Sequence, residues 1–154
     1  MILNKKDISA QVGDGVYAPQ PARAFKIDPS VSSAFGAGTP CKLAGVASNG
    51  MAVVTPITAT TDTVYCVISS NLRNNSFTGG DIVKGWVSDE YVWLEASAAI
   101  TAGAAVNAGT NGKVAAQTAG NTVLGIAESS AAASGDLVAV RITSPYKVYG
   151  EATA

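Results

Sequence analysis

From about residue 34 onward, apolar and polar residues alternate in short runs separated by turn-forming pairs such as Asn49-Gly50 and Asn111-Gly112. Alternation over about four to eight residues is typical of strands with one buried face. Strands spaced roughly 8–12 residues apart favour an all-β sandwich or barrel. The predicted strands are 39–46, 51–57, 63–69, 81–87, 91–95, 104–107, 113–116, 122–128 and 137–143.

One stretch also fits a helix. The segment "EASAAITAGAAV", residues 95–106, is rich in alanine, which favours helices. Gly103 interrupts it, and the β-branched residues Ile100 and Thr101 weaken it further, so we predict no helix there. The segment "SSAAAS", residues 129–134, fits either a single helical turn or a loop.

The strand pattern occurs twice. Each copy has a strand led by glycine, an Asn-Gly turn, a Thr-Val strand, a variable loop and a Gly-Asp strand, and the copies are offset by about 60 residues. One copy supplies about four strands, which is few for an independent core. We therefore predict two tandem, internally repeated small β-barrel or β-sandwich units, residues 34–88 and 100–143, joined by a linking strand at 89–99. The sequence leaves open whether the units share a core or close as separate barrels.

The two ends of the chain lack this pattern. Residues 1–33 contain three prolines, and only "RAFKID", residues 23–28, alternates. Because proline lacks the N–H group that an interior strand needs, its flanking prolines favour an extended arm or an edge strand. We predict an N-terminal arm over residues 1–33 that lies on another molecule, and a C-terminal tail over residues 144–154.

Composition points to extensive contact with other chains. Charged residues are 14% of the 154 residues and hydrophobic residues 47%, whereas an ordinary soluble domain is roughly 25% charged. The net charge is −1, and the sequence has no basic patch that would neutralise phosphates. We therefore predict no nucleic-acid partner. No run matches the ~20 apolar residues of a membrane helix or the apolar core of a signal peptide. We therefore predict no membrane partner and a cytosolic product with reduced thiols.

Two cysteines, Cys41 and Cys66, lie inside predicted strands. Paired, they form one disulfide; unpaired, they are small buried hydrophobes, as free cysteine usually is. The sequence leaves their pairing open.

Candidate catalytic chemistry is scarce. The chain has no histidine, the commonest general base and metal ligand, and two cysteines without CxxC spacing do not complete a zinc site. It contains no nucleophile elbow and no phosphate-binding loop. We predict no catalytic residue, cofactor or metal ion, and therefore no enzyme. The one catalytic alternative is a pair of carboxylates, with candidates Asp89, Glu90, Glu95 and Glu128.

Two further pairs of residues have structural and functional interpretations. Asp81 and Asp136 each follow a glycine at equivalent places in the two copies, where we predict that they accept backbone hydrogen bonds within a turn. The tryptophans, Trp86 and Trp93, are suited to stacking on sugars, with Tyr91 beside Trp93. Because this segment joins the two copies, we favour packing in the core or in the seam between the units.

The order of motifs resembles a known family. The segments "FTGGDIVKGWV", "VWLEASAAITAGAAV" and "GNTVLGIAESSAAASGDLVAVRI" resemble the capsid cement (decoration) proteins of tailed bacteriophages over roughly residues 35–143. The resemblance implies a small all-β protein without catalysis or cofactor. It implies binding to the outer surface of a phage head, as a homotrimer or else a homodimer, where the protein bridges neighbouring major capsid protein subunits and stabilises the shell. Its location is then the virion, after synthesis in the bacterial host cytoplasm.

The residues that contact the capsid are predicted to be apolar anchors in the arm and aromatic anchors in the tail, because interface energy concentrates in a few buried aromatic side chains. On this hypothesis, deleting residues 1–28 abolishes shell binding without unfolding the body. Three alternatives stay open: a carbohydrate-binding or adhesin-type β module, a phage tail or fibre component, and an enzyme with two carboxylates. The predicted contact residues are Val16, Tyr17, Phe25, Ile27, Tyr146 and Tyr149.

Overall fold

The computed structural model describes residues 10–71 and 75–144, and within these ranges it contains strands and no helix. This confirms the predicted all-β class. The strands are β1 (Arg23–Ile27), β2 (Phe35–Gly36), β3 (Pro40–Val46), β4 (Ala52–Pro56), β5 (Cys66–Ile68), β6 (Ser76–Phe77), β7 (Ile82–Trp86), β8 (Tyr91–Glu95), β9 (Ala105–Ala108), β10 (Val114–Ala116), β11 (Val123–Ala127) and β12 (Leu137–Ile142).

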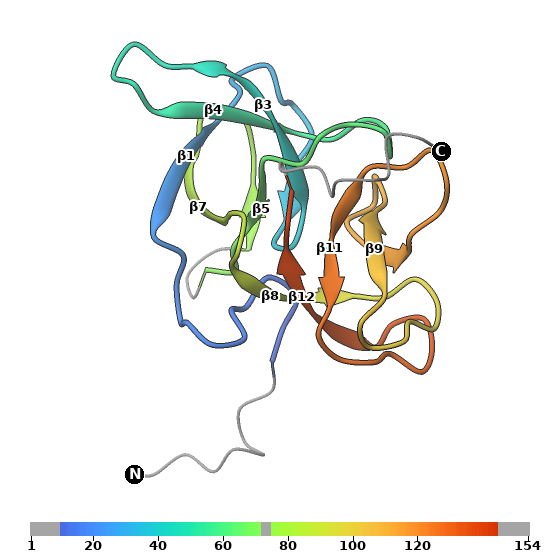
Figure 1. Cartoon of the computed structure of the whole chain (residues 1–154). Helices are drawn as coiled ribbons and strands as arrows, with labels where there is room; N and C mark the ends of the chain where they lie inside the picture. The colour runs from blue at the N-terminus through green and yellow to red at the C-terminus, as the bar shows by residue number, and fades with distance from the viewer. Residues whose placement is uncertain (1–9, 72–74, 145–154) are drawn as a thin grey trace, which may run out of the picture.

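The strands form two units that lie side by side (Figure 1). The first is a closed barrel in the order β1-β4-β3-β5-β7, and the second is a five-stranded sheet in the order β10-β9-β11-β12-β8. A two-stranded sheet, β2-β6, accompanies the barrel. The prediction of two small β units is therefore confirmed.

The strand order repeats between the units. The series β4-β3-β5-β7 corresponds to β10-β9-β11-β12, and every neighbouring pair in both series is antiparallel. The register supports this correspondence, because Cys41 lies opposite Cys66 in the first unit and Val106 lies opposite Gly125 in the second. The similarity between the two copies in the sequence thus reflects one arrangement of strands used twice.

Each unit also has a fifth strand outside the repeat that the sequence suggested. β1 pairs antiparallel with β7 and parallel with β4, which closes the barrel. β8 pairs antiparallel with β12, and Ala96, directly after it, forms a parallel bridge to Val114 of β10. Residues 23–27, expected in the arm, are thus a barrel strand, and the expected linking strand belongs to the second sheet. The prolines that suggested an arm, Pro21 and Pro29, flank β1 and need not donate to its ladder.

The molecule has two hydrophobic cores. The first fills the barrel and includes Phe25, Ile27 and Val54. The second lies within the second unit but also contains residues of the first unit, among them Trp86, which is only 1% exposed. The barrel therefore has its own core, whereas the second core crosses the seam between the units. For Trp86 this agrees with the predicted packing in the seam.

Polar contacts tie the same seam together. The Thr122 N–H donates to the Thr60 carbonyl at 3.0 Å, and the Thr60 hydroxyl bonds the Asn121 side-chain oxygen at 2.6 Å. The Ser144 hydroxyl, which is buried, donates to the Val64 carbonyl at 2.6 Å. Satisfied polar groups of this kind fix the relative placement of packed elements more narrowly than apolar contact alone.

Residues 11–16, called the clamp segment below, lie at the seam and contact both units. The Gly13 N–H donates to the Trp93 carbonyl and the Trp93 N–H to the Asp14 carbonyl, both at 2.8 Å. The Gly13 carbonyl accepts from the indole N–H of Trp86 at 2.9 Å and from the backbone N–H of Ser70 at 3.1 Å. This part of the expected arm therefore rests on its own chain. Removing residues 1–28 would strip both this contact and β1 from the body, contrary to the expectation from the sequence.

Candidate docking surfaces

The contact residues predicted from the sequence have different surroundings. Tyr17 is 77% exposed, and its ring packs edge-to-face on Tyr91 with centroids 4.9 Å apart. Val16 is half-buried, and its backbone N–H donates to the Tyr91 carbonyl at 3.1 Å. Tyr17 is thus well placed to touch a partner. The other two predicted arm residues, Phe25 and Ile27, are buried and not exposed. Tyr146 and Tyr149 lie outside the described residues.

Phe25 and Ile27 are core residues of the barrel rather than exposed anchors. Both are 0% exposed. They occupy alternate positions of β1, and alternate side chains of a strand point to the same face, which here is the barrel interior. Neither side chain is able to contact another molecule while the barrel is folded.

A long hairpin, formed by β3 and β4, projects beyond the barrel (Figure 1). Val46 is 68% and Leu43 48% exposed on it, and Met51 near its tip is half-buried. From Leu43 to Thr61 the chain carries no charged residue. An uncharged, partly apolar projection of this kind favours contact with another protein surface.

The second unit supplies a comparison for this hairpin. In the first unit the paired strands run from Cys41 to Pro56, whereas in the second they run from Val106 only to Ala116. Gly112, at the tip of the shorter hairpin, lies near Gly38 and Thr39 of the first unit. The longer hairpin is therefore an addition to the first unit, and the shared arrangement of strands does not require it.

An ion pair holds the loop at the base of this hairpin. The Lys42 ammonium nitrogen lies 3.0 Å from Oδ2 of Asp62. The same oxygen accepts from the backbone N–H groups of Thr58 at 2.9 Å and Ala59 at 3.1 Å. The Thr58 N–H, followed by Lys42, lowers the pKa of Asp62 to about 2. The carboxylate thus stays ionised and keeps the loop after β4 in place.

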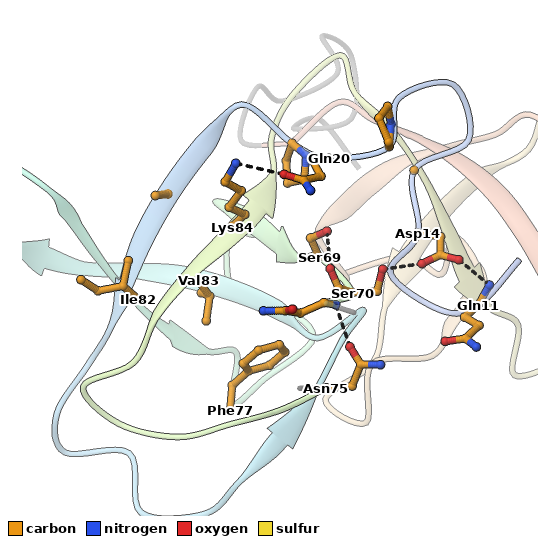
Figure 2. A pocket seen from close by; sticks show the side chains of 15 residues that line it. Gln11, Asp14, Gln20, Ser69, Ser70, Asn75, Phe77, Ile82, Val83 and Lys84 are labelled. Carbon is orange, nitrogen blue, oxygen red and sulfur yellow. Dashed lines mark hydrogen bonds between the residues drawn. The ribbon is translucent and has the colours of Figure 1, made fainter. Parts of the chain in front are cut away.

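A groove of about 1100 Å³ lies between the clamp segment, the following loop and the outer wall of the barrel (Figure 2). Asp14 is held there by Ser70, whose hydroxyl donates to Oδ1, and by the Gln11 N–H, which donates to Oδ2 at 2.9 Å. Lys84 donates to the side-chain oxygen of Gln20 at 3.2 Å. The groove is lined by Gln11, Asp14, Gly15, Pro19, Gln20, Pro21, Ala24, Ser69, Ser70, Asn71, Asn75, Phe77, Ile82, Val83 and Lys84.

The groove is not lined by a pair of carboxylates such as a glycosidase uses. Among the lining residues Asp14 is the one acid, and both of its oxygens already accept hydrogen bonds. A general base must be within reach of the proton it removes, and two carboxylates are needed for glycoside hydrolysis. The groove is better suited to bind uncharged groups through its amides, hydroxyls and apolar side chains, and Ile82 stands 66% exposed among them.

The other carboxylates proposed for catalysis have structural partners. Oε1 of Glu90 accepts from the Val87 N–H at 2.9 Å. Glu95 pairs with Lys113 at 3.3 Å, and Glu128 approaches Arg141 at 3.7 Å. Asp89, the remaining candidate, occupies a turn with φ of 72°. Over residues 10–71 and 75–144, no group of three or more His, Cys, Asp or Glu residues is placed to hold a metal ion.

The Gly-Asp pairs form the turns expected of them. Oδ2 of Asp81 accepts from the Thr78 N–H at 2.9 Å, and Oδ2 of Asp136 accepts from the Ala133 N–H at 3.0 Å. Asp14 makes the same bond to the residue three positions before it, so Gly13-Asp14 is a third copy of this turn. The sequence contains this Gly-Asp signal, although no turn was predicted there. All three glycines have positive φ, between 87° and 94°.

The structure leaves less aromatic surface exposed for stacking on sugars than the sequence suggested. Trp86 is buried in the seam and its indole N–H is bonded to Gly13. Trp93 and Tyr91 are half-buried on the outer face of β8. In the described part of the chain, no helix is long and apolar enough to cross a membrane.

Comparison with solved structures shows where this fold occurs elsewhere. The chain is similar to the head fibre gp8.5 N base of bacteriophage phi29, with a TM-score of 0.55 and 16% sequence identity. The two chains therefore have a similar fold. The match covers 81% of this chain and 94% of the other, so it includes both units rather than one barrel. No model of a protein family and no curated protein sequence matches the chain.

Proposed function

We propose that this chain is a structural protein of a bacteriophage virion, attached to the outside of the head. The observation that carries the proposal is the similarity of its fold to the base of a phage head fibre, over 81% of this chain and 94% of the other. The order of motifs in the sequence, which resembles phage decoration proteins, supports the same location. The partner is the major capsid protein, and no catalytic step, nucleic acid or membrane enters the function.

Two finer roles fit this location. The fold favours the base of a fibre or a similar head-attached component. The sequence motifs favour a cement protein that bridges neighbouring capsid subunits. Both roles suit an oligomer, because several weak contacts on a repeating lattice give high overall affinity. A homotrimer is favoured over a homodimer on the resemblance to the decoration proteins.

We assign the capsid contact to the projecting β3–β4 hairpin, with Val46 and Leu43 as its apolar side chains. Both are exposed in the isolated chain, and from Leu43 to the end of β4 the hairpin carries no charge that would have to lose its hydration on docking. The second unit lacks the extension, which separates this contact from features that folding alone requires. The occupant is an uncharged, apolar patch of the capsid protein.

The test is to mix purified protein with undecorated phage shells and image them by electron cryomicroscopy. Additional density at fixed lattice positions is expected, and shells that stay bare at saturating protein would refute attachment to the head. Heating decorated and bare shells separates the two roles. A cement protein raises the temperature at which shells rupture, whereas a fibre base leaves it unchanged.

Matched variants locate the contact. Val46→Asp is expected to remove the shell density, because it places a charge in an apolar interface. Ile82→Asp introduces the same charge at a similarly exposed position in the groove, and binding is expected to persist. The reverse result would assign the contact to the groove. Tyr17→Ala tests the predicted contact residue that is exposed within the described part of the chain.

A further inference from the structure

The two cysteines face each other inside the barrel. Cys41 on β3 lies directly opposite Cys66 on β5 in an antiparallel pair, and both side chains are free and 0% exposed. Side chains of directly opposite residues point to the same face of a sheet. The side chains of Cys41 and Cys66 therefore point into the same part of the barrel core.

The backbone at this position is already suited to a disulfide. Opposite residues of an antiparallel pair have Cα atoms about 4.5–5.5 Å apart, within the ~4.4–6.8 Å that disulfides span. The hydrogen bond with the Cys66 thiol, followed by burial, raises the pKa of the Cys41 thiol well above its ordinary value. The two thiol groups are thus within hydrogen-bonding reach of each other, on strands that hold their Cα atoms directly opposite.

The repeat shows that folding does not demand this pair. The equivalent positions of the second unit are Val106 and Gly125, which also lie opposite each other. Strands in this arrangement therefore pair without cysteine at these two positions. The pair in the first unit encloses the chain from β3 to β5, which includes the whole projecting hairpin.

We propose that Cys41 and Cys66 form a cross-strand disulfide when the protein leaves the reducing cytoplasm of the host. This inference rests on the proposed function, because a virion is released into an oxidising medium. The bond would join the base of the projecting hairpin to β5 and fix the element assigned to the capsid contact.

The oxidant is a small-molecule disulfide such as oxidised glutathione. One cysteine thiolate attacks it, forming a mixed disulfide and releasing one glutathione thiolate. The second cysteine thiolate attacks the protein sulfur of that mixed disulfide, closing the protein disulfide and releasing the second glutathione. The two thiol protons end on the two released glutathiones, so the protein is oxidised by two electrons and glutathione disulfide is reduced by two. Because both thiols are buried, the reaction waits for a local opening of the barrel and is slow.

The test treats folded full-length protein with oxidised glutathione and follows its intact mass and its Tm. The expected product is lighter by two hydrogen atoms and carries no glutathione. Its Tm is higher by about 10 °C, as expected for closing a loop of this size, and dithiothreitol reverses both changes. Cys66→Ala is the control, because a single thiol cannot give the lighter product.

Three outcomes would overturn the inference. The folded protein stays reduced until denaturant is added, it gains glutathione on both cysteines, or the oxidised form melts at a lower temperature than the reduced form. Because these measurements use isolated protein, they are independent of shell binding. Shell binding without disulfide formation would leave the proposed function intact, and a disulfide in a protein that binds no shell would overturn that function and not the chemistry.

Discussion

Phe25 is a residue whose replacement distinguishes a barrel strand from a docking arm. Its ring is 0% exposed and packs edge-to-face on Tyr65, with centroids 5.8 Å apart. It also lies against Gly85 of β7, where a Cβ would approach within 3.0 Å of the ring. Phe25→Ala empties this space without removing a backbone hydrogen bond.

The expected loss follows from this packing. Phenylalanine to alanine in a closed core costs about 3–5 kcal/mol, and the edge-to-face contact accounts for about 0.5–1.5 kcal/mol beyond area burial. The barrel strands on either side are hydrogen-bonded along their length, which limits how far the site is able to collapse. We therefore expect a loss of about 4 kcal/mol, against a total stability of roughly 5–15 kcal/mol for a domain. The corresponding fall in Tm is about 10 °C.

Urea unfolding monitored by circular dichroism and tryptophan fluorescence measures this loss. Tyr17→Ala is the matched control, because Tyr17 is an aromatic residue of the same segment but is 77% exposed. We expect the control to lose less than about 1 kcal/mol. If Phe25→Ala proves as stable as the control and instead fails to bind shells, β1 does not belong to the barrel in solution and the arm interpretation is restored.

Two further predictions concern stability. Asp62 has a pKa of about 2 when folded, below the ~3.9 of an unfolded aspartate, so its contribution is present above pH 4 and is lost as the pH falls toward 2. Urea midpoints between pH 5 and pH 2 should fall further for wild type than for Asp62→Asn. Gly13→Ala puts a Cβ 2.7 Å from that of Ala37, whereas Gly50→Ala, with a similar φ, meets no atom within 4 Å. Thermal melting should show a much larger loss for Gly13→Ala, and equal losses would mean that the clamp segment is not packed as described.

Local pattern was enough to predict β3, β4, β5, β7 and the five strands of the second unit, together with their repetition, but not the two-residue strands β2 and β6. Alternation marks one buried face, and glycine with asparagine or aspartate marks the turns between runs. These signals depend on neighbouring residues only, so they survive without knowledge of the fold. Gly80-Asp81 and Gly135-Asp136, for example, form turns in which the aspartate accepts a backbone N–H, as predicted.

Strand partners, in contrast, were not predictable from local pattern. Phe25 lies opposite Val83 in β7, and Leu94 lies opposite Val138 in β12, so β1 and β8 have equivalent places. The residues that make them equivalent share little beyond being apolar. Alternation in β1 predicts a half-buried strand, but it does not show whether the partner strands belong to the same chain. Phe25 was therefore mistaken for a residue that contacts another molecule.

The clamp segment illustrates a related limit. Gly13 lies between Trp86 and Trp93, residues far along the chain, and its carbonyl and N–H are bonded to both. Nothing near Gly13 specifies these partners. The sequence does contain a Gly-Asp pair like the two in the repeats. That pair identifies a turn, but it does not identify the residues against which the turn packs.

The internal repeat helps to separate folding from function. Features that both units share, such as the strand order and the Gly-Asp turns, are explained by the need to build two small cores. The first unit alone carries the long hairpin and the facing thiols, and at both places the second unit shows that the strands pair without them. The need to fold therefore does not explain these two departures from the repeat. The two departures are also adjacent along the chain, since Cys41 begins the stretch that forms the hairpin and Cys66 ends the loop that follows it. Under the proposed function, a disulfide between the two thiols would stiffen the base of the hairpin and lower the entropy lost on binding, so one mechanical explanation would cover both departures.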